Sequence, residues 1–193
     1  MESLLQPSRL WTRSEVVSRP SPVPRQSGIY AWYFRVVPPG VPVSDCHRFG
    51  EAVLLYVGIS PKAPSRNGFP SSRQHISSRI RYHYRGNAEG STLRLTLGCL
   101  LSDALGLQLR RVGSGKRMTF SSGESVLSEW MAVNALVTWT THPTPWQLEE
   151  ELIAKVSLPL NLDMNDGHPF HGPLSRARRE ARVTARDLPV LPC

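Results

Sequence analysis

The sequence predicts an α+β fold in which a small apolar sheet is flanked by helices. Residues 28–37 and 52–60 are rich in aliphatic, β-branched and aromatic side chains, which is the composition of buried strands. A third segment of this kind, residues 137–141, comes much later in the chain. Between the second and third segments, apolar residues recur at the three- and four-residue spacing of helices. This combination of short strands and separate helical stretches is the basis for the α+β class.

The first two strands are expected to pair with each other as an antiparallel hairpin. Pro38, Pro39 and Gly40 end the first strand, because proline has no N–H to donate to a neighbouring strand. Residues 41–50 then form a loop, which makes a long connection for a hairpin. Antiparallel strands can be joined directly in this way, whereas parallel strands usually need a helical crossover.

A helix is predicted after the second strand, beyond a loop at residues 61–70 that is rich in proline, glycine and serine. Ser71 and Ser72 are its expected N-caps, because a serine hydroxyl accepts a hydrogen bond from the free N–H groups of the first turn. The helix is expected to run to about Arg85 and to stop at Gly86.

Four further helices follow from apolar periodicity, from caps and from the pattern of basic residues. Pro145 is suited to the first turn of one of them, where its missing N–H has no helical partner in any case. A hairpin is expected around the glycine-rich turn at residues 113–115, so that a hairpin and a helix are inserted before the third strand. The four predicted helices cover residues 91–105, 124–136, 144–155 and 175–186.

Composition divides the chain into three parts. Residues 1–25 are rich in proline, serine and arginine and predict an extended N-terminal lead-in. Residues 26–165 contain the strands and most of the helices and predict one domain of ordinary size. Residues 166–193 predict a basic C-terminal tail, within which the helix over residues 175–186 would lie.

The charge indicates a polyanionic partner. The net charge is +8 and the isoelectric point is about 10.0, which favours association with nucleic acid through long-range attraction and counterion release. Of the 23 basic residues, 20 are arginines, whose planar forks suit phosphate oxygens; GC-biased codon usage would produce the same excess. Arg178, Arg182 and Arg186 follow at four-residue intervals and would share one helical face as nucleic-acid contacts.

No segment predicts contact with a membrane. No apolar run approaches the roughly 20 residues of a membrane span, and the first ten residues lack the apolar core of a signal peptide. The three cysteines, Cys46, Cys99 and Cys193, have no metal-ligand or redox spacing. We therefore expect a cytoplasmic protein.

A set of short motifs resembles the GIY-YIG nuclease superfamily. Gly28-Ile29-Tyr30 followed by Tyr56-Val57-Gly58 is similar to the two triplets that name the family, with valine replacing isoleucine in the second. Three further matches follow in the family's order. They are Arg79-Ile80 with His83, Glu149 with Leu152-Ile153, and Pro159 with Asn161.

The resemblance implies a three-stranded antiparallel sheet with flanking helices within residues 26–165. The sequence departs from the family pattern in two respects. The gap between the triplets is longer than usual, and the loop before Arg79 places that residue further downstream. In addition, Ile59 follows the second triplet where the family often has lysine, and Lys62 is a possible substitute.

The resemblance also implies a site for phosphodiester hydrolysis. Tyr30, Tyr56, Arg79, His83 and Asn161 are the catalytic candidates, with arginine placed to meet charge that develops on phosphate. Glu149 is the candidate ligand for one Mg²⁺ or Mn²⁺ ion, which prefers oxygen ligands. A tyrosine has a pKa near 10 and is a poor base at neutral pH unless neighbouring cations lower that pKa. Arg79, His83 and the metal are the expected sources of that field.

Each of these residues also has an ordinary structural interpretation. The two tyrosines would suit the surface of a sheet, and Asn161 would suit a turn. Arg79 lies near Arg81 and Arg85, which are themselves candidate nucleic-acid contacts on the same helix. Glu149 begins a run of three glutamates that would be favourable in the first turn of any helix.

The sequence therefore supports a metal-dependent endonuclease that hydrolyses DNA by a one-metal mechanism. The alternative is a non-catalytic nucleic-acid-binding protein that retains the fold. A basic protein directed to RNA or the ribosome is a third possibility that the charge alone permits. The complete set of tyrosines, arginine, histidine and glutamate favours the enzyme, because a binding module has no need of Glu149.

Overall fold

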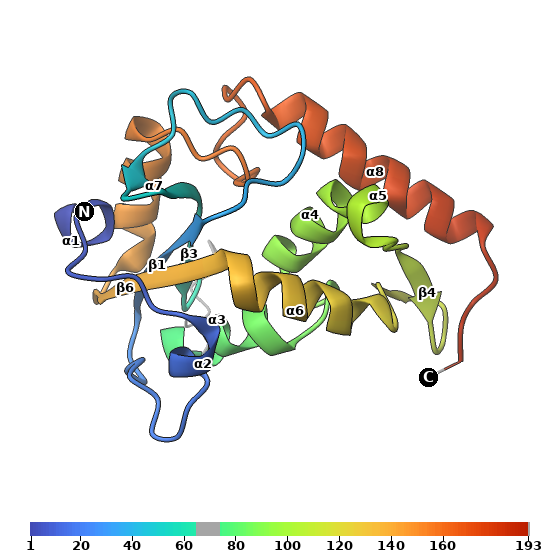
Figure 1. Cartoon of the computed structure of the whole chain (residues 1–193), viewed down its shortest axis with the longest axis horizontal. Coiled ribbons are helices and arrows are strands. Elements are labelled where there is room, and N and C mark those ends of the chain that lie inside the picture. Colours follow the sequence, from blue (N-terminus) through green and yellow to red (C-terminus); the bar gives the residue numbers. More distant parts are fainter. Residues whose placement is uncertain (65–73, 193) are drawn as a thin grey trace.

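The computed structural model describes residues 1–64 and 74–192 and contains a central antiparallel sheet with helices on both faces (Figure 1). The sheet has the strand order β2-β3-β1-β6, so the expectation of three strands is wrong by one. The fourth strand, β2 (Arg48–Phe49), has two residues and pairs with the start of β3. It lies in the long connection that was expected to be a loop, and it is too short to have its own sequence pattern.

The other three strands are those that the sequence predicts. β1 (Gly28–Phe34) lies between β3 (Ala52–Ser60) and β6 (Ala135–Thr141) and is antiparallel to both. Every residue of β1 is buried, which explains its continuous apolar and aromatic composition. A register shift opposite Trp32 and Tyr33 marks a bulge in the β1–β3 pair.

Two hydrophobic clusters lie on opposite faces of this sheet. The smaller cluster packs α1 (Glu2–Leu5) and α7 (Pro145–Lys155) against Ile29, Ala31 and Tyr33. The larger cluster contains Tyr30 and Trp32 from the other face of β1 and side chains from most of the remaining helices. The alternation along β1 therefore gives each face its own helical layer.

The helices of the larger layer follow the predicted order with changed boundaries. α3 (Ile76–Arg85) is capped by His75, and the expected caps Ser71 and Ser72 lie outside the described residues. The helix expected over residues 91–105 is divided into α4 (Thr92–Leu100) and α5 (Ser102–Leu105). The Ser102 hydroxyl donates to the Cys99 carbonyl at this break, in place of a regular backbone bond.

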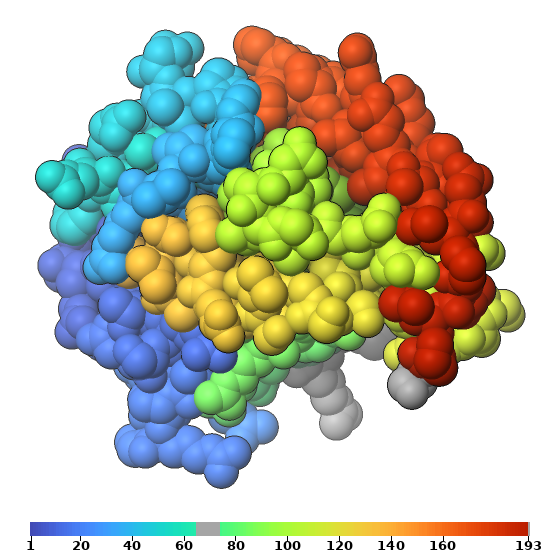
Figure 2. Space-filling view, turned by 45° about the vertical axis from the view of Figure 1, so that its right-hand side comes forward, coloured from blue at the N-terminus to red at the C-terminus, as the bar shows by residue number. Residues whose placement is uncertain are grey.

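The inserted hairpin and helix are also present. β4 (Arg110–Val112) and β5 (Arg117–Thr119) pair as a separate two-stranded sheet, and α6 (Gly123–Asn134) leads into β6. α8 (His171–Asp187) spans most of the basic C-terminal segment and packs along α4 (Figure 1). The C-terminal segment forms the upper right of the surface in Figure 2.

The N-terminal segment is only partly extended, unlike the expected lead-in. It contains α1 and α2 (Arg13–Val16), and Trp11 forms a backbone bridge with Val137 of β6. Leu4 and Val16 are buried, so this segment packs as part of the folded core. Among the described residues, no helix is both long and apolar enough to cross a bilayer.

Candidate active site

The glycines of the two triplets are explained by close packing. A Cβ at Gly28 would lie 2.3 Å from the backbone oxygen of Thr140 on β6. A Cβ at Gly58 would lie 2.7 Å from the Tyr30 hydroxyl and 2.9 Å from its ring. Tyr30 and Gly58 are partners in the β1–β3 register, so the absent side chain at position 58 makes the space that the Tyr30 phenol occupies.

Tyr30 begins a buried chain of hydrogen bonds that leads away from the sheet. Its hydroxyl lies 2.9 Å from Nε2 of His83 on α3, and Nδ1 of His83 lies 2.7 Å from the Ser91 hydroxyl. Ser91 also accepts the backbone N–H of Arg94 and thereby caps α4. Since Tyr30, His83 and Ser91 are at most 1% exposed, their positions are fixed by packing as well as by hydrogen bonds.

Both ends of the first hydrogen bond are neutral near pH 7. Burial raises the pKa of Tyr30 well above its usual value, and nearby Tyr56 raises it further, whereas Arg79 lowers it in part. Burial lowers the pKa of His83 well below its usual range, with further lowering by Arg79 and Arg94. The expectation that His83 supplies a cationic field to Tyr30 is therefore wrong, because the buried imidazole is uncharged. It can instead accept or donate a proton.

Tyr56 lies on the same side of the sheet as Tyr30. Its ring packs edge-on against His83 at 6.2 Å between centroids, and its hydroxyl lies 3.3 Å from that of Thr92 at the start of α4. The ring is only partly buried, but desolvation by the surrounding protein still raises the pKa of Tyr56. The two tyrosines therefore converge on one histidine.

Arg79 is one helical turn before His83 and is directed to the same site. One guanidinium nitrogen donates to the Gly90 carbonyl at 2.7 Å, and the charge lowers the pKa of both Tyr30 and Tyr56. The side chain is partly exposed and forms no ion pair with any carboxylate in residues 1–64 and 74–192. It is thus a positioned cation that still has donors for an anion.

Glu149 approaches the tyrosines from α7 and has the environment of a cation ligand. It is partly buried and makes no hydrogen bond or ion pair with the residues that the structure describes. Burial raises the pKa of Glu149 to about 7, nearby Asp163 raises it further, and Lys62 lowers it in part. Among the described residues, no group of three or more histidine, cysteine, aspartate or glutamate side chains is placed to hold a metal ion. Glu149 is therefore a single oxygen ligand, which suits a hard cation such as Mg²⁺ that keeps several waters.

Asn161 lies at the outer edge of β3. Its side-chain oxygen accepts the backbone N–H of Val57 at 2.9 Å, and its side-chain nitrogen donates to the Val57 carbonyl at 3.0 Å. Both functional atoms of the amide are therefore occupied by the backbone between Tyr56 and Gly58. This arrangement fixes the backbone of the second triplet.

A second layer behind the site was not predicted from the sequence. Arg94 is fully buried on α4, donates to the His83 carbonyl at 3.2 Å and forms an ion pair with Glu124 of α6 at 2.6 Å. Removing one partner of such a pair costs about 3–5 kcal/mol, because the other charge is left buried. The sequence signal for Arg94 was a charged residue in the otherwise apolar segment of α4. No sequence feature indicated that Ser91 would contact both His83 and the backbone of Arg94.

The predicted nucleic-acid contacts lie on two different surfaces. Arg81 and Arg85 project from the side of α3 that faces away from His83, where they line a groove. Arg178 and Arg182 of α8 are partly buried, and Arg186 is exposed near the end of that helix. Arg178 is close enough to Tyr56 for the tyrosine to affect its pKa, so the first half of α8 borders the site.

A comparison with protein families finds one model, described as the GIY-YIG catalytic domain, that matches residues 28–180. Neither the comparison with curated proteins nor that with solved structures finds a match. The matched span contains both triplets, Arg79, His83, Glu149 and Asn161. GIY-YIG domains are those of endonucleases, which act on DNA and generally depend on divalent metal ions. Because the match extends over most of the chain, the protein belongs to the GIY-YIG family.

Proposed function

We propose that the protein is a DNA endonuclease that hydrolyses phosphodiester bonds at the site formed by Tyr30, Tyr56, Arg79, His83 and Glu149. The observation that supports this most directly is the hydrogen-bonded pair of Tyr30 and His83 with Arg79 beside it. A proton acceptor and a phosphate-binding cation are thus next to an unpaired carboxylate on α7. Phosphodiester hydrolysis by water requires these groups.

Tyr30 is the proposed base, and His83 is the group that makes its action feasible. A phenol with a raised pKa carries its proton at neutral pH and cannot accept another without losing the first. The neutral His83 Nε2 is 2.9 Å from the hydroxyl and can take that proton as the hydroxyl oxygen accepts one from the attacking water. The water oxygen then bonds to phosphorus, and the bond from phosphorus to the leaving oxygen breaks. Ser91 holds the imidazole in place throughout.

Arg79 and Glu149 are proposed to stabilise the negative charge that develops on the phosphate during this reaction. The Arg79 guanidinium is fixed at Gly90 and contributes its remaining donors to the phosphate oxygens as negative charge increases. Glu149 is the residue that would hold a Mg²⁺ or Mn²⁺ ion, which when bound stabilises negative charge on the phosphate and the leaving oxygen. We propose a positioning role for Asn161, through its two bonds to Val57.

Arg178, Arg182 and Arg186 of α8 are proposed to hold the DNA backbone close to the site. The Nε of Arg178 is buried with no hydrogen-bond partner among the described residues. Burial lowers the pKa of Arg178, and nearby Tyr56 is one of the groups that raise it in part. Each arginine that neutralises a phosphate contributes about 0.9 to the slope of log affinity against log salt. Replacing the three residues with alanine should flatten that slope without changing turnover at saturating enzyme.

The first test is incubation of the purified protein with plasmid, linear duplex, single-stranded DNA and RNA, each with Mg²⁺, Mn²⁺ or EDTA. We expect cleavage of DNA with either cation and none with EDTA. Binding to DNA without cleavage under any condition would favour the non-catalytic alternative. Cleavage of RNA alone would replace the proposed substrate.

A further inference from the structure

We infer that the groove beside α3 is a second DNA-binding site, which holds the backbone of the strand on one side of the bond that is cut. This groove has a volume of about 680 Å³ and lies between residues 21–25 and the outer side of α3. The inference rests on the proposed function and extends it, because it specifies the path of the substrate away from the active site.

The charge of the groove fits a phosphate backbone. Arg25, Arg81 and Arg85 line it together with His75, and no aspartate or glutamate is among the lining residues. Arg81 and Arg85 form no hydrogen bond or ion pair with the part of the chain that the structure describes. Their donors are therefore free to bind an anion.

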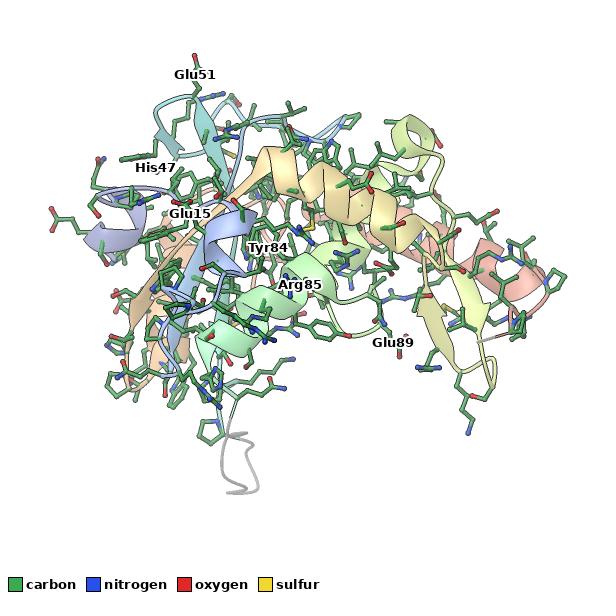
Figure 3. All side chains as sticks on the ribbon, turned by 60° about the horizontal axis from the view of Figure 1, so that its bottom comes forward. Glu15, His47, Glu51, Tyr84, Arg85 and Glu89 are labelled. Carbon is green, nitrogen blue, oxygen red and sulfur yellow. The ribbon has the colours of Figure 1, made fainter. Side chains whose placement is uncertain are left out.

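The carboxylate on the neighbouring helix α2 is already paired. Glu15 of α2 is visible next to α3 in Figure 3, but Arg9 and the cap of α2 occupy its carboxylate. The same figure shows Arg85 on the α3 surface that faces the viewer.

His75 holds Arg25 at one side of the groove. Its Nε2 lies 3.3 Å from the Nε of Arg25, and its Nδ1 lies 3.1 Å from the backbone nitrogen of Ser78, where it caps α3. These contacts involve only the Nε of the Arg25 guanidinium. Its two terminal nitrogens form no hydrogen bond or ion pair with the described residues and can meet a phosphate oxygen.

Tyr82 connects the groove to the active site. It lies on α3 between Arg79 and the groove residues, and its ring packs so closely on Gly86 and Gly90 that a Cβ at either glycine would clash with it. Gly90 is also the residue whose carbonyl binds Arg79. Tyr82 is 38% exposed, and its ring offers an apolar face on which a base next to the bound phosphates can stack. A strand that leaves Arg79 thus meets Tyr82 and then Arg81 and Arg85.

The test is DNA binding in EDTA, where cleavage does not interfere, measured by fluorescence anisotropy over a range of salt concentrations. Arg81→Ala and Arg85→Ala are compared with Arg48→Ala, which removes the same charge from an exposed position on β2 outside the groove. Each groove variant should lower the slope of log affinity against log salt by about 0.9. When the salt concentration rises fourfold, the fold-loss of affinity of the variant should then be about 3.5 times smaller than the fold-loss of wild type. Arg48→Ala should retain the wild-type slope.

A photoreactive phenylalanine analogue at position 82 provides a second measurement, since it retains an aromatic ring. We expect it to crosslink to DNA, and the same analogue at position 48 to give no crosslink. Equal slopes for Arg85→Ala and Arg48→Ala, or no crosslink at position 82, would overturn the groove as a DNA site while wild-type cleavage still supported the proposed function. A wild-type protein that neither binds nor cuts DNA would overturn both.

Discussion

The two sides of the candidate site are built differently. On the α3 side, Tyr30, His83 and Ser91 are buried and connected by hydrogen bonds. Ser91 also accepts the backbone N–H of Arg94, whose side chain is paired with Glu124. On the α7 side, Glu149 makes no hydrogen bond with the described residues. The charges of Asp163 and Lys62 affect its pKa without direct contact. The α3 side is thus fully hydrogen-bonded within the protein. Glu149 on the α7 side has no such partner, and in the proposed mechanism it holds the cation. The difference predicts which substitutions affect chemistry, affinity and stability.

The largest effect is expected from removing the carboxylate. Glu149→Gln should abolish cleavage and leave DNA affinity nearly unchanged, because the basic surfaces supply most of the affinity. Glu150→Gln, at the exposed neighbouring position, is the matched control and should cut normally. Single-turnover cleavage and anisotropy measure the two properties separately. Undiminished cleavage by Glu149→Gln, or full wild-type activity in EDTA, would exclude the metal-dependent mechanism.

Tyr30 and Tyr33 allow a test of the buried side. Both are buried phenols on β1 whose hydroxyls are hydrogen-bonded, but Tyr33 faces the other layer and donates to the Leu4 carbonyl. Tyr30→Phe should lower single-turnover rates about 10²–10⁴-fold, the usual contribution of a general base. Tyr33→Phe should retain activity and lose about 1 kcal/mol of unfolding free energy. Comparable rates for the two variants would show that Tyr30 is only a packing residue.

Arg79 should affect turnover more than affinity. Arg79→Ala is expected to lower the single-turnover rate about 10²–10³-fold at saturating enzyme, because it removes a fixed donor for developing charge. Arg79→Lys should restore little of this loss, since lysine lacks the forked geometry. Arg81→Ala on the groove side of α3 should change binding and leave the saturated rate intact. Equal losses for Arg79→Ala and Arg81→Ala would indicate a general electrostatic effect.

The smallest effect concerns stability against pH in the absence of metal, where the two sides should respond in opposite directions. The pKa of His83 is lower in the folded protein than the unfolded value near 6.5, so acidification below pH 6.5 protonates the unfolded chain first. The stability that this group contributes is present above pH 6.5 and is lost by up to about 1.4 kcal/mol per unit as the pH falls. The pKa of Glu149 is raised to about 7, so the folded protein binds its proton first and acidification between pH 7 and 4.5 is stabilising at this position.

Denaturant titrations in EDTA between pH 7 and 5 measure both contributions. His83→Gln should lose less stability on acidification than wild type, and Glu149→Gln should lose more. Identical pH dependence in all three proteins would mean that neither group has a displaced pKa in the folded state.

Much of this site follows from the sequence, because its residues occur in local patterns. The strands around Tyr30 and Tyr56 have continuous apolar composition, and the spacing of Arg79 and His83 places them on one helical face. The Arg94–Glu124 pair could not be predicted, because its two residues are 30 positions apart in the sequence and meet only through the packing of two helices. The neutral state of His83 was also inaccessible, since desolvation depends on the complete fold.

The contacts of Asn161 have a consequence for association between molecules. Beyond its short pairing with β2, β3 is an edge strand, and free N–H and C=O groups on such an edge can recruit a strand from another molecule. Here Leu160 donates to the Leu55 carbonyl, and the Asn161 amide occupies both backbone groups of Val57. Leu160 and Asn161 therefore occupy backbone groups of β3 that a strand from another molecule would need for pairing. The segment that positions the second triplet thus also protects this edge of the sheet from intermolecular strand pairing.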